Sequence, residues 1–128
     1  MATNLQFMKP NAQTIRLTFL GGSLGTALRF ALFAFYGDLL SVVFVNLVGA
    51  ALIGWFNGNK NTDTDSFNAL WKIGFAGGFT TMSGFAALVV LYTNEIGVQA
   101  IIYALLITAA GLGAYWLAFM ISRERARA

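Results

Sequence analysis

Four long apolar runs alternate with short polar segments along this chain. The runs cover residues 15–36, 39–58, 70–92 and 97–121, and each approaches the length of about 20 residues that a helix needs to cross a bilayer. The connections are Gly37-Asp38, residues 57–65 and residues 93–97, all rich in turn-forming residues. Because two of these connections are tight, we expect sequential helices to form antiparallel hairpins. The pattern predicts an all-α membrane protein in which residues 1–128 form a single domain of four transmembrane helices.

The composition agrees with a membrane protein and excludes several kinds of chemistry. Of the 128 residues, 58% are hydrophobic and 10% are charged, whereas a soluble domain has about 25% charged residues. The mean hydropathy is +0.70. The absence of Cys and His excludes disulfides, thiolate and ordinary zinc sites, and a Ser-His catalytic pair. We therefore expect a protein that is not an enzyme.

Residues 74–85 form an unusual stretch inside the third predicted span. They read Gly74-Phe75-Ala76-Gly77-Gly78-Phe79-Thr80-Thr81-Met82-Ser83-Gly84-Phe85. Each glycine costs a helix interior about 1 kcal/mol relative to alanine. Non-helical backbone in a membrane is tolerated where protein buries it or where it lines a cavity, so a break here indicates a site. The alternative is that the glycines only allow close helix packing while the hydroxyls bond back to their own helix.

Two polar side chains lie inside the first two spans, and each has two interpretations. Arg29 either attracts an anion at the mouth of a pathway or extends its charge to the membrane interface from the end of its helix. Asn46 either links two helices through its amide or offers its NH₂ donors to a ligand. Position alone leaves both alternatives open.

The charges predict one orientation in the membrane. Four spans place both termini and the second connection on one side. That side collects Lys9, Arg16, Lys60, Lys72, Arg123, Arg125 and Arg127. The other side has only Arg29, so both termini are expected in the cytoplasm. Residues 1–13 lack the order of a cleavable signal and are expected to form a short tail or an amphipathic lead-in.

The polar residues within the predicted spans suit an anion better than a cation. An anion in a low-dielectric pathway needs amide donors, hydroxyls, helix N-termini and the positive edges of aromatic rings. Residues of that kind are Asn46, Thr80, Thr81, Ser83 and Phe85. All five acidic residues fall in connections or in the C-terminal tail. A small multidrug or guanidinium-type exporter typically needs a carboxylate in its first span, and residues 15–36 contain none. This class is therefore the alternative, together with a non-conducting structural subunit.

Three motifs occur in a fixed order along the spans. They are Gly21-Gly22-Ser23-Leu24-Gly25-Thr26-Ala27-Leu28-Arg29-Phe30, then Val45-Asn46-Leu47-Val48-Gly49 with Gly54, then Gly74-x-x-Gly77-Gly78-x-Thr80-Thr81-Met82-Ser83-Gly84-Phe85. Together they resemble the motifs of the CrcB/Fluc fluoride channels. The resemblance implies an antiparallel dimer of four-helix subunits, with the third helix broken near Gly77-Thr80, in the bacterial plasma (inner) membrane. It also implies passive, fluoride-selective export that relieves fluoride toxicity.

The resemblance also implies roles for individual residues. Residues expected along the fluoride pathway are Asn46 as an anion donor, Phe85 through its ring edge, Ser83 and Thr81 in a polar track, Met82, Thr108 on the last span and Arg29 in the vestibule. The backbone carbonyls of Gly77 and Thr80 are expected to bind a structural Na⁺ shared by the two subunits. Two carbonyls from each subunit would give four oxygens on a two-fold axis.

The chain departs from the family pattern at two positions. The family usually reads Thr-Thr-Phe-Ser-Thr-Phe, whereas this chain has Met82 and Gly84 at the third and fifth of these positions. Met lacks a positive ring edge and Gly lacks a hydroxyl, so a pore that depends on both positions is weakened. Together with the charge bias, this suggests one half of a heterodimer with an oppositely oriented homologous subunit. The alternative is a homodimer that tolerates the substitutions.

Overall fold

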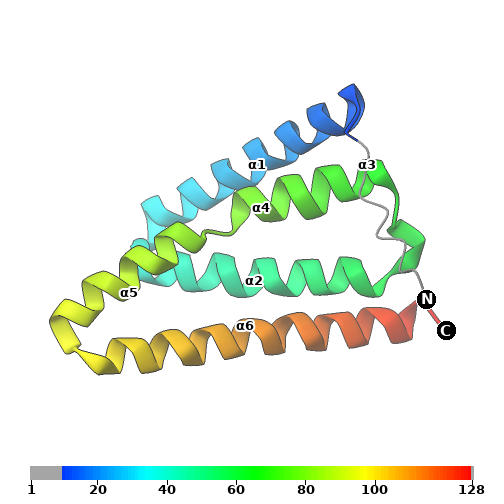
Figure 1. Ribbon diagram of the computed structural model, residues 1–128. Helices are drawn as coiled ribbons and strands as arrows, with labels where there is room; N and C mark the ends of the chain where they lie inside the picture. The colour runs from blue at the N-terminus through cyan, green and yellow to red at the C-terminus, as the bar shows by residue number, and fades with distance from the viewer. Residues whose placement is uncertain (1–9, 128) are drawn as a thin grey trace.

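The computed structural model describes residues 10–127, which form helices joined by short turns (Figure 1). The elements are α1 (Ala12–Tyr36), α2 (Asp38–Gly58), η1 (Lys60–Thr62), α3 (Asp65–Phe67), η2 (Asn68–Phe75), α4 (Ala76–Phe79), α5 (Met82–Ile96) and α6 (Val98–Arg125). Four helical segments are long and apolar enough to cross a membrane: Ala12–Tyr36, Asp38–Gly58, Asp65–Ile96 and Val98–Arg125. The prediction of an all-helical chain with four membrane-capable helices is confirmed for the described residues.

Polar caps extend the helices beyond the predicted apolar runs. α1 begins at Ala12 because the Asn11 side chain accepts a hydrogen bond from the Thr14 amide at 2.8 Å. The third span begins at Asp65, after Thr64 at the N-cap, and the last helix continues through the charged tail to Arg125. The predicted lead-in extends to residue 13, but Ala12 and Gln13 already belong to α1. Its residues 1–9 lie outside the described part of the chain.

Glycine turns make the first and last hairpins tight. Gly37 joins α1 to α2 with φ of 76°, and Gly97 joins α5 to α6 with φ of 65°. Residues with a Cβ rarely adopt these angles, whereas glycine does so at little cost. Each turn thus reverses the chain within one residue. The connections are shorter than predicted, because Asp38 and residues 93–96 belong to helices.

Close glycine contacts hold α1 against the first half of the third span. A Cβ at Gly21 would lie 2.8 Å from the Phe75 amide nitrogen, and one at Gly25 would lie 2.7 Å from that of Phe79. From the opposite side, a Cβ at Gly78 would lie 2.9 Å from the Gly22 α-carbon. The close-packing interpretation of these small residues is therefore confirmed, and the helix backbones touch with no side chain between them.

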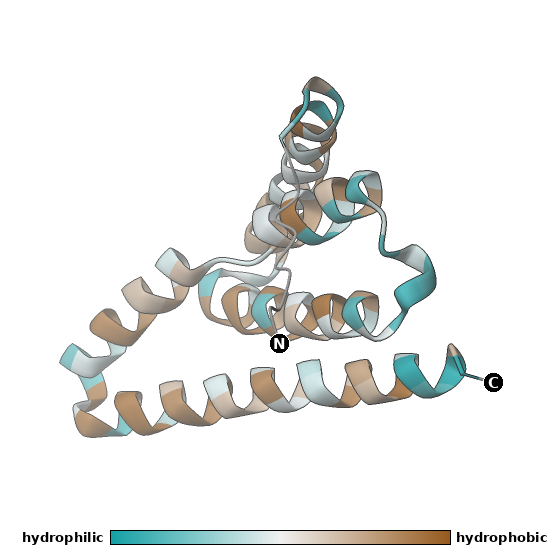
Figure 2. Cartoon of the chain, turned by 45° about the vertical axis from the view of Figure 1, so that its right-hand side comes forward, coloured by the Kyte–Doolittle hydropathy of each residue, from teal (hydrophilic) through white to brown (hydrophobic). Residues whose placement is uncertain are grey.

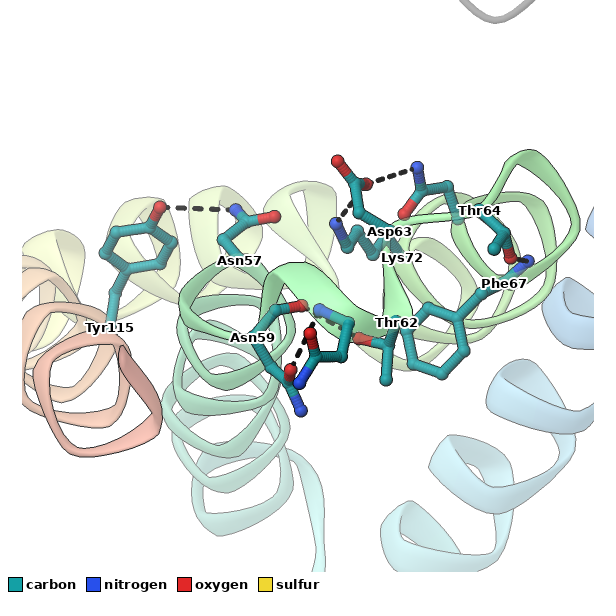
Figure 3. Close-up of polar contacts among 10 residues, drawn as sticks. Asn57, Asn59, Thr62, Asp63, Thr64, Phe67, Lys72 and Tyr115 are labelled. Atoms are coloured by element: carbon teal, nitrogen blue, oxygen red, sulfur yellow. Dashed lines mark hydrogen bonds and ion pairs between the residues drawn. The ribbon is translucent and has the colours of Figure 1, made fainter. Parts of the chain in front are cut away.

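The second close pair is α2 and α6, which run side by side along the lower part of Figure 1. Here a Cβ at Gly54 would meet the Tyr115 backbone, and one at Gly58 would lie 2.8 Å from the Ser122 Cβ. The Asn57 amide also donates to the Tyr115 hydroxyl at 3.2 Å (Figure 3). Small residues thus bring α2 and α6 together as they do α1 and α4.

Hydrophilic residues gather at the η1 connection and at the C-terminal end of α6, which lie on the same side of the molecule in Figure 2. In this connection the Asp63 carboxylate accepts from Lys72 at 3.3 Å and from Asn68 at 2.8 Å (Figure 3 shows Asp63 and Lys72). The Asn68 hydrogen bond, reinforced by the hydrogen bond and charge of Lys72, lowers the pKa of Asp63 below its ordinary value. These contacts order the connection at the polar end of the helices.

Much of the apolar surface is left uncovered within the chain. The hydrophobic residues buried inside it are Val42, Val45, Ala69, Ala76, Phe79 and Ala100. The most apolar 18-residue window of α6 contains no buried residue. A soluble domain does not expose apolar surface on this scale, so lipid or other membrane helices must cover it.

Candidate functional site at the helix interruption

The helical backbone stops after Phe79 and resumes at Met82. Thr80 has φ −77° and ψ 159°, and Thr81 has φ −146° and ψ 103°, so both residues are extended. We call these two residues the interruption. Gly77 and Gly78 weaken the helix before it. Thr81 then starts α5, because its Oγ1 accepts from the Gly84 amide at 3.0 Å.

Side chains from two other helices hold the backbone of the interruption. Arg29 of α1 donates from Nη1 to the Thr80 carbonyl oxygen at 2.8 Å. Asn46 of α2 accepts from the Thr81 amide at 2.8 Å and donates to the Thr81 carbonyl at 3.1 Å. The Thr80 amide still reaches Ala76, at 3.0 Å. An unsatisfied backbone group costs several kcal/mol in a membrane. These bonds remove that cost for the extended segment, so it can exist there.

The Thr80 side chain is fixed as tightly as its backbone. Its hydroxyl donates to the Ala76 carbonyl at 2.8 Å. Its methyl group lies against the α-carbon of Gly49, where any Cβ would overlap it. Gly49 is a site residue whose role the sequence analysis missed, although it stands in the same motif as Asn46. The available signal was its spacing, three residues after Asn46, which places both on one face of α2.

A row of aromatic rings runs from the η1 connection toward the interruption. Phe56 of α2 meets Trp71 at a ring distance of 6.4 Å. Trp71, Phe75 and Phe79 then follow one another at 5.5 and 5.6 Å. Phe79 is buried and directly precedes Thr80. The row therefore links the third span to α2 at Phe56 and continues along the third span itself to the interruption.

Arg29 has a partner on another helix that neither of its two sequence interpretations included. Its guanidinium reaches across to the third span and donates to the Thr80 carbonyl. The reason is the close approach of α1 and α4, which brings a strong acceptor within reach of the cation. The vestibule role stays a prediction.

Asn46 serves one of its two proposed uses inside this chain, because its amide links α2 to the third span. Nδ2 has two hydrogens, and within residues 10–127 it makes one hydrogen bond, to Thr81. The second N–H is therefore free to meet a ligand. The two interpretations of Asn46 are compatible.

The remaining predicted pathway residues lie around this network. Ser83 brings its hydroxyl oxygen to 3.4 Å from that of Thr81. Met82 is 79% exposed at the start of α5. Phe85 lines an apolar cavity of about 830 Å³ between the ends of α1, α2, α5 and α6. Thr108 lies on an exposed face of α6 and bonds back to the Ala104 carbonyl at 2.8 Å, so the structure does not bring it into the network.

Backbone oxygens are the groups here that could hold a metal ion. Within residues 10–127 there is no cluster of three or more acidic, His or Cys side chains. In a continuous helix the Thr81 amide would donate to the Gly77 carbonyl, but it donates to Asn46 instead. Gly77 is exposed, so its carbonyl oxygen is accessible. Carbonyl oxygens are ligands that suit a hard cation such as Na⁺. Thr80 also fits, because a carbonyl has two lone pairs and Arg29 occupies one.

Comparison with known proteins gives a family match and named relatives. The family model described as "CrcB-like protein, Camphor Resistance (CrcB)" matches residues 16–119. A "Fluoride-specific ion channel FluC 2" of Rhodococcus jostii is 32% identical over 114 residues, which cover 85% of this chain and 98% of the relative. A "Fluoride-specific ion channel FluC" of Escherichia coli is 34% identical over 96 residues, which cover 65% of this chain and 72% of the relative.

Proposed function

This chain belongs to the CrcB family, and on that premise we propose that it forms a fluoride-selective channel that exports fluoride passively and relieves fluoride toxicity. The observation that carries the proposal is the network at the interruption. It combines free donors with an interior that lacks acidic side chains, in a chain whose similarity to a fluoride-specific channel covers 98% of that relative. The relatives are ion channels rather than enzymes, and their names favour neither an exporter of organic cations nor a structural subunit.

Fluoride is a small anion and a strong hydrogen-bond acceptor, so short N–H and O–H donors must replace its water. The second N–H of Asn46 and the hydroxyl of Ser83 are such donors beside the N-terminus of α5. Phe85 adds a positive ring edge from the next turn. In the proposed pathway these residues act together with Arg29, Thr81, Met82 and Thr108.

A Na⁺ ion at the interruption is a second part of the proposal. The Gly77 and Thr80 carbonyls of two subunits would hold it on the two-fold axis, and the ion would supply positive charge that fixes the subunits to each other. Replacing Na⁺ by N-methylglucamine is expected to lower the melting temperature of the purified assembly. An unchanged melting temperature would remove Na⁺ from the proposal and leave the channel function standing.

We place the protein in the bacterial plasma membrane with both termini in the cytoplasm, on the charge asymmetry of its connections. An antiparallel dimer is part of the proposal because the family resemblance implies one. The exposed apolar faces are compatible with it, since either lipid or partner helices can cover them. The strong charge bias, Met82 and Gly84 favour a heterodimer with an oppositely oriented homologous subunit. A homodimer that tolerates both residues is the second form of the proposal.

Fluoride efflux from liposomes tests the channel function. We expect the purified chain, alone or with an oppositely oriented family member, to release fluoride and retain chloride. Asn46→Asp should abolish release. The new carboxylate can still accept the hydrogen bond from the Thr81 amide, but it lacks both N–H donors of asparagine and adds a negative charge. Asn61→Asp makes the same chemical change in the exposed connection and should conduct normally.

The outcomes separate the alternatives. Full efflux from the chain alone excludes the need for a heterodimer. Efflux that requires the second subunit supports it. If well-folded protein releases no fluoride in either arrangement, the channel function is wrong.

A further inference from the structure

The Arg29 guanidinium donates a hydrogen bond to the protein backbone, at a place where the resemblance expects it to attract anions. We propose that Arg29 is a positioning residue, which holds one peptide unit of the interruption so that Asn46 keeps its orientation toward fluoride. The inference rests on the proposed function for the role of Asn46. It assigns Arg29 a task that its charge alone would not perform.

The first argument is that two side chains grip the same peptide unit. The Thr80 carbonyl, which accepts from Arg29, and the Thr81 amide, which donates to Asn46, belong to one peptide group. A trans peptide is planar, and its C=O and N–H point in opposite directions. Arg29 of α1 and Asn46 of α2 therefore hold this plane from its two sides. If the bond between Arg29 and the Thr80 carbonyl is lost, the peptide plane can rotate, and the hydrogen bond from the Thr81 amide to Asn46 weakens.

The second argument is that Arg29 is placed by a rigid helix face. Gly22, Gly25 and Thr26 lie three to seven residues before Arg29 and share its face of α1. A Cβ at Gly25 would lie 2.7 Å from the Phe79 amide nitrogen, and the Thr26 hydroxyl reaches the Gly78 carbonyl at 3.4 Å. This face of α1 packs directly against α4 as far as the last turn of α4. Arg29 thus meets the first carbonyl beyond the end of that helix.

The third argument concerns energy. A charged side chain at membrane depth is retained when it has a strong partner, and a guanidinium-to-carbonyl bond at 2.8 Å is charge-assisted. The carbonyls at the C-terminal end of a helix carry partial negative charge, which favours a cation there. The anion donors Asn46 and Ser83 are linked through Thr81 instead. The charge of Arg29 therefore stabilises the backbone that supports those donors.

The test compares Arg29→Gln and Arg29→Lys with Arg16→Gln, which removes an exposed arginine from the other end of α1. The ¹³C-carbonyl signal of Thr80 and hydrogen exchange of the Thr81 amide report on the peptide unit, and fluoride efflux reports on function. For Arg29→Gln we expect a shifted Thr80 signal, at least roughly tenfold faster Thr81 exchange and reduced efflux. Arg29→Lys keeps a donor and a charge, so it should recover part of each readout. Arg16→Gln should change none.

Ionic strength distinguishes positioning from direct attraction of the anion. A positioning defect persists when salt is raised from about 0.1 M to about 1 M, whereas a lost vestibule charge is largely screened at the higher value. The inference is overturned if Arg29→Gln leaves the Thr80 and Thr81 signals in place, or if its efflux defect disappears in high salt. Should Arg29→Gln fail to fold, the Thr80 and Thr81 signals of Arg29→Lys decide in the same way. Wild-type protein that releases no fluoride, either alone or with the second subunit, would refute the proposed function. The spectroscopic readouts would still test whether Arg29 holds the peptide unit.

Discussion

Adding one methyl group at Gly49 should destabilise the protein through a single contact. The new Cβ would overlap the Thr80 methyl carbon, while the next atoms, Thr80 Cβ at 3.6 Å and Phe79 Cδ1 at 3.8 Å, lie at ordinary contact distance. The Thr80 side chain cannot rotate away freely, because its hydroxyl is bonded to the Ala76 carbonyl at 2.8 Å. The strain therefore falls on the interruption itself.

The magnitude follows from two opposing effects. Replacing glycine by alanine inside a helix gains about 1 kcal/mol of helix propensity. Forcing an extra carbon into a filled site costs about 1–3 kcal/mol. Gly113→Ala is the matched control, because a Cβ there has no atom within 4 Å and experiences only the first effect. Gly49→Ala should thus be about 1–3 kcal/mol less stable than Gly113→Ala.

A second substitution identifies the atom responsible. Thr80→Ser removes the methyl and keeps the hydroxyl bond, so alone it should cost about 0.8 kcal/mol, the value of one buried methyl group. The double variant Gly49→Ala/Thr80→Ser gives the new methyl the vacated space and should recover most of the lost stability. Reversible unfolding in mixed micelles, followed by tryptophan fluorescence, measures the cycle. Gly49→Ala as stable as Gly113→Ala, or a coupling energy below about 0.5 kcal/mol, would refute the reasoning.

Three further predictions concern the helix contacts and the polar end. Gly25→Ala should prevent close packing of α1 and cost more than about 3 kcal/mol in the same unfolding assay, whereas Gly22→Ala should be tolerated because its nearest neighbour would lie at 3.7 Å. The lowered pKa of Asp63 stabilises the fold above the unfolded pKa of about 3.9, and this contribution is lost as pH falls through the folded value. Asp63→Asn should remove that pH dependence at a cost below about 1 kcal/mol, since the carboxylate is 59% exposed. Arg125→Ala should cost about 0.5–1 kcal/mol and alter Trp55 fluorescence, because the guanidinium lies 5.4 Å from that ring.

The sequence by itself determined the elements of this protein. The lengths of the apolar runs predicted four membrane-capable helices, because the bilayer sets the length of a spanning helix and the backbone must satisfy its own hydrogen bonds there. Glycine at positions 21, 25, 74 and 78 predicted close packing, since only a missing side chain lets helix backbones touch. The helix bounds were less accurate, as caps such as Thr64 extend a helix beyond its apolar residues.

The tertiary structure alone decided what the polar residues do. Arg29 meets Thr80 across 51 residues, and Asn46 meets Thr81 across 35. Such partners depend on the relative rotation and depth of packed helices, which a periodic pattern within one helix does not specify. The sequence accordingly left two uses open for Arg29 and for Asn46, and it gave no indication that Gly49 holds the Thr80 methyl. Local patterns determine where helices form, whereas the register between helices determines which backbone groups their side chains can reach.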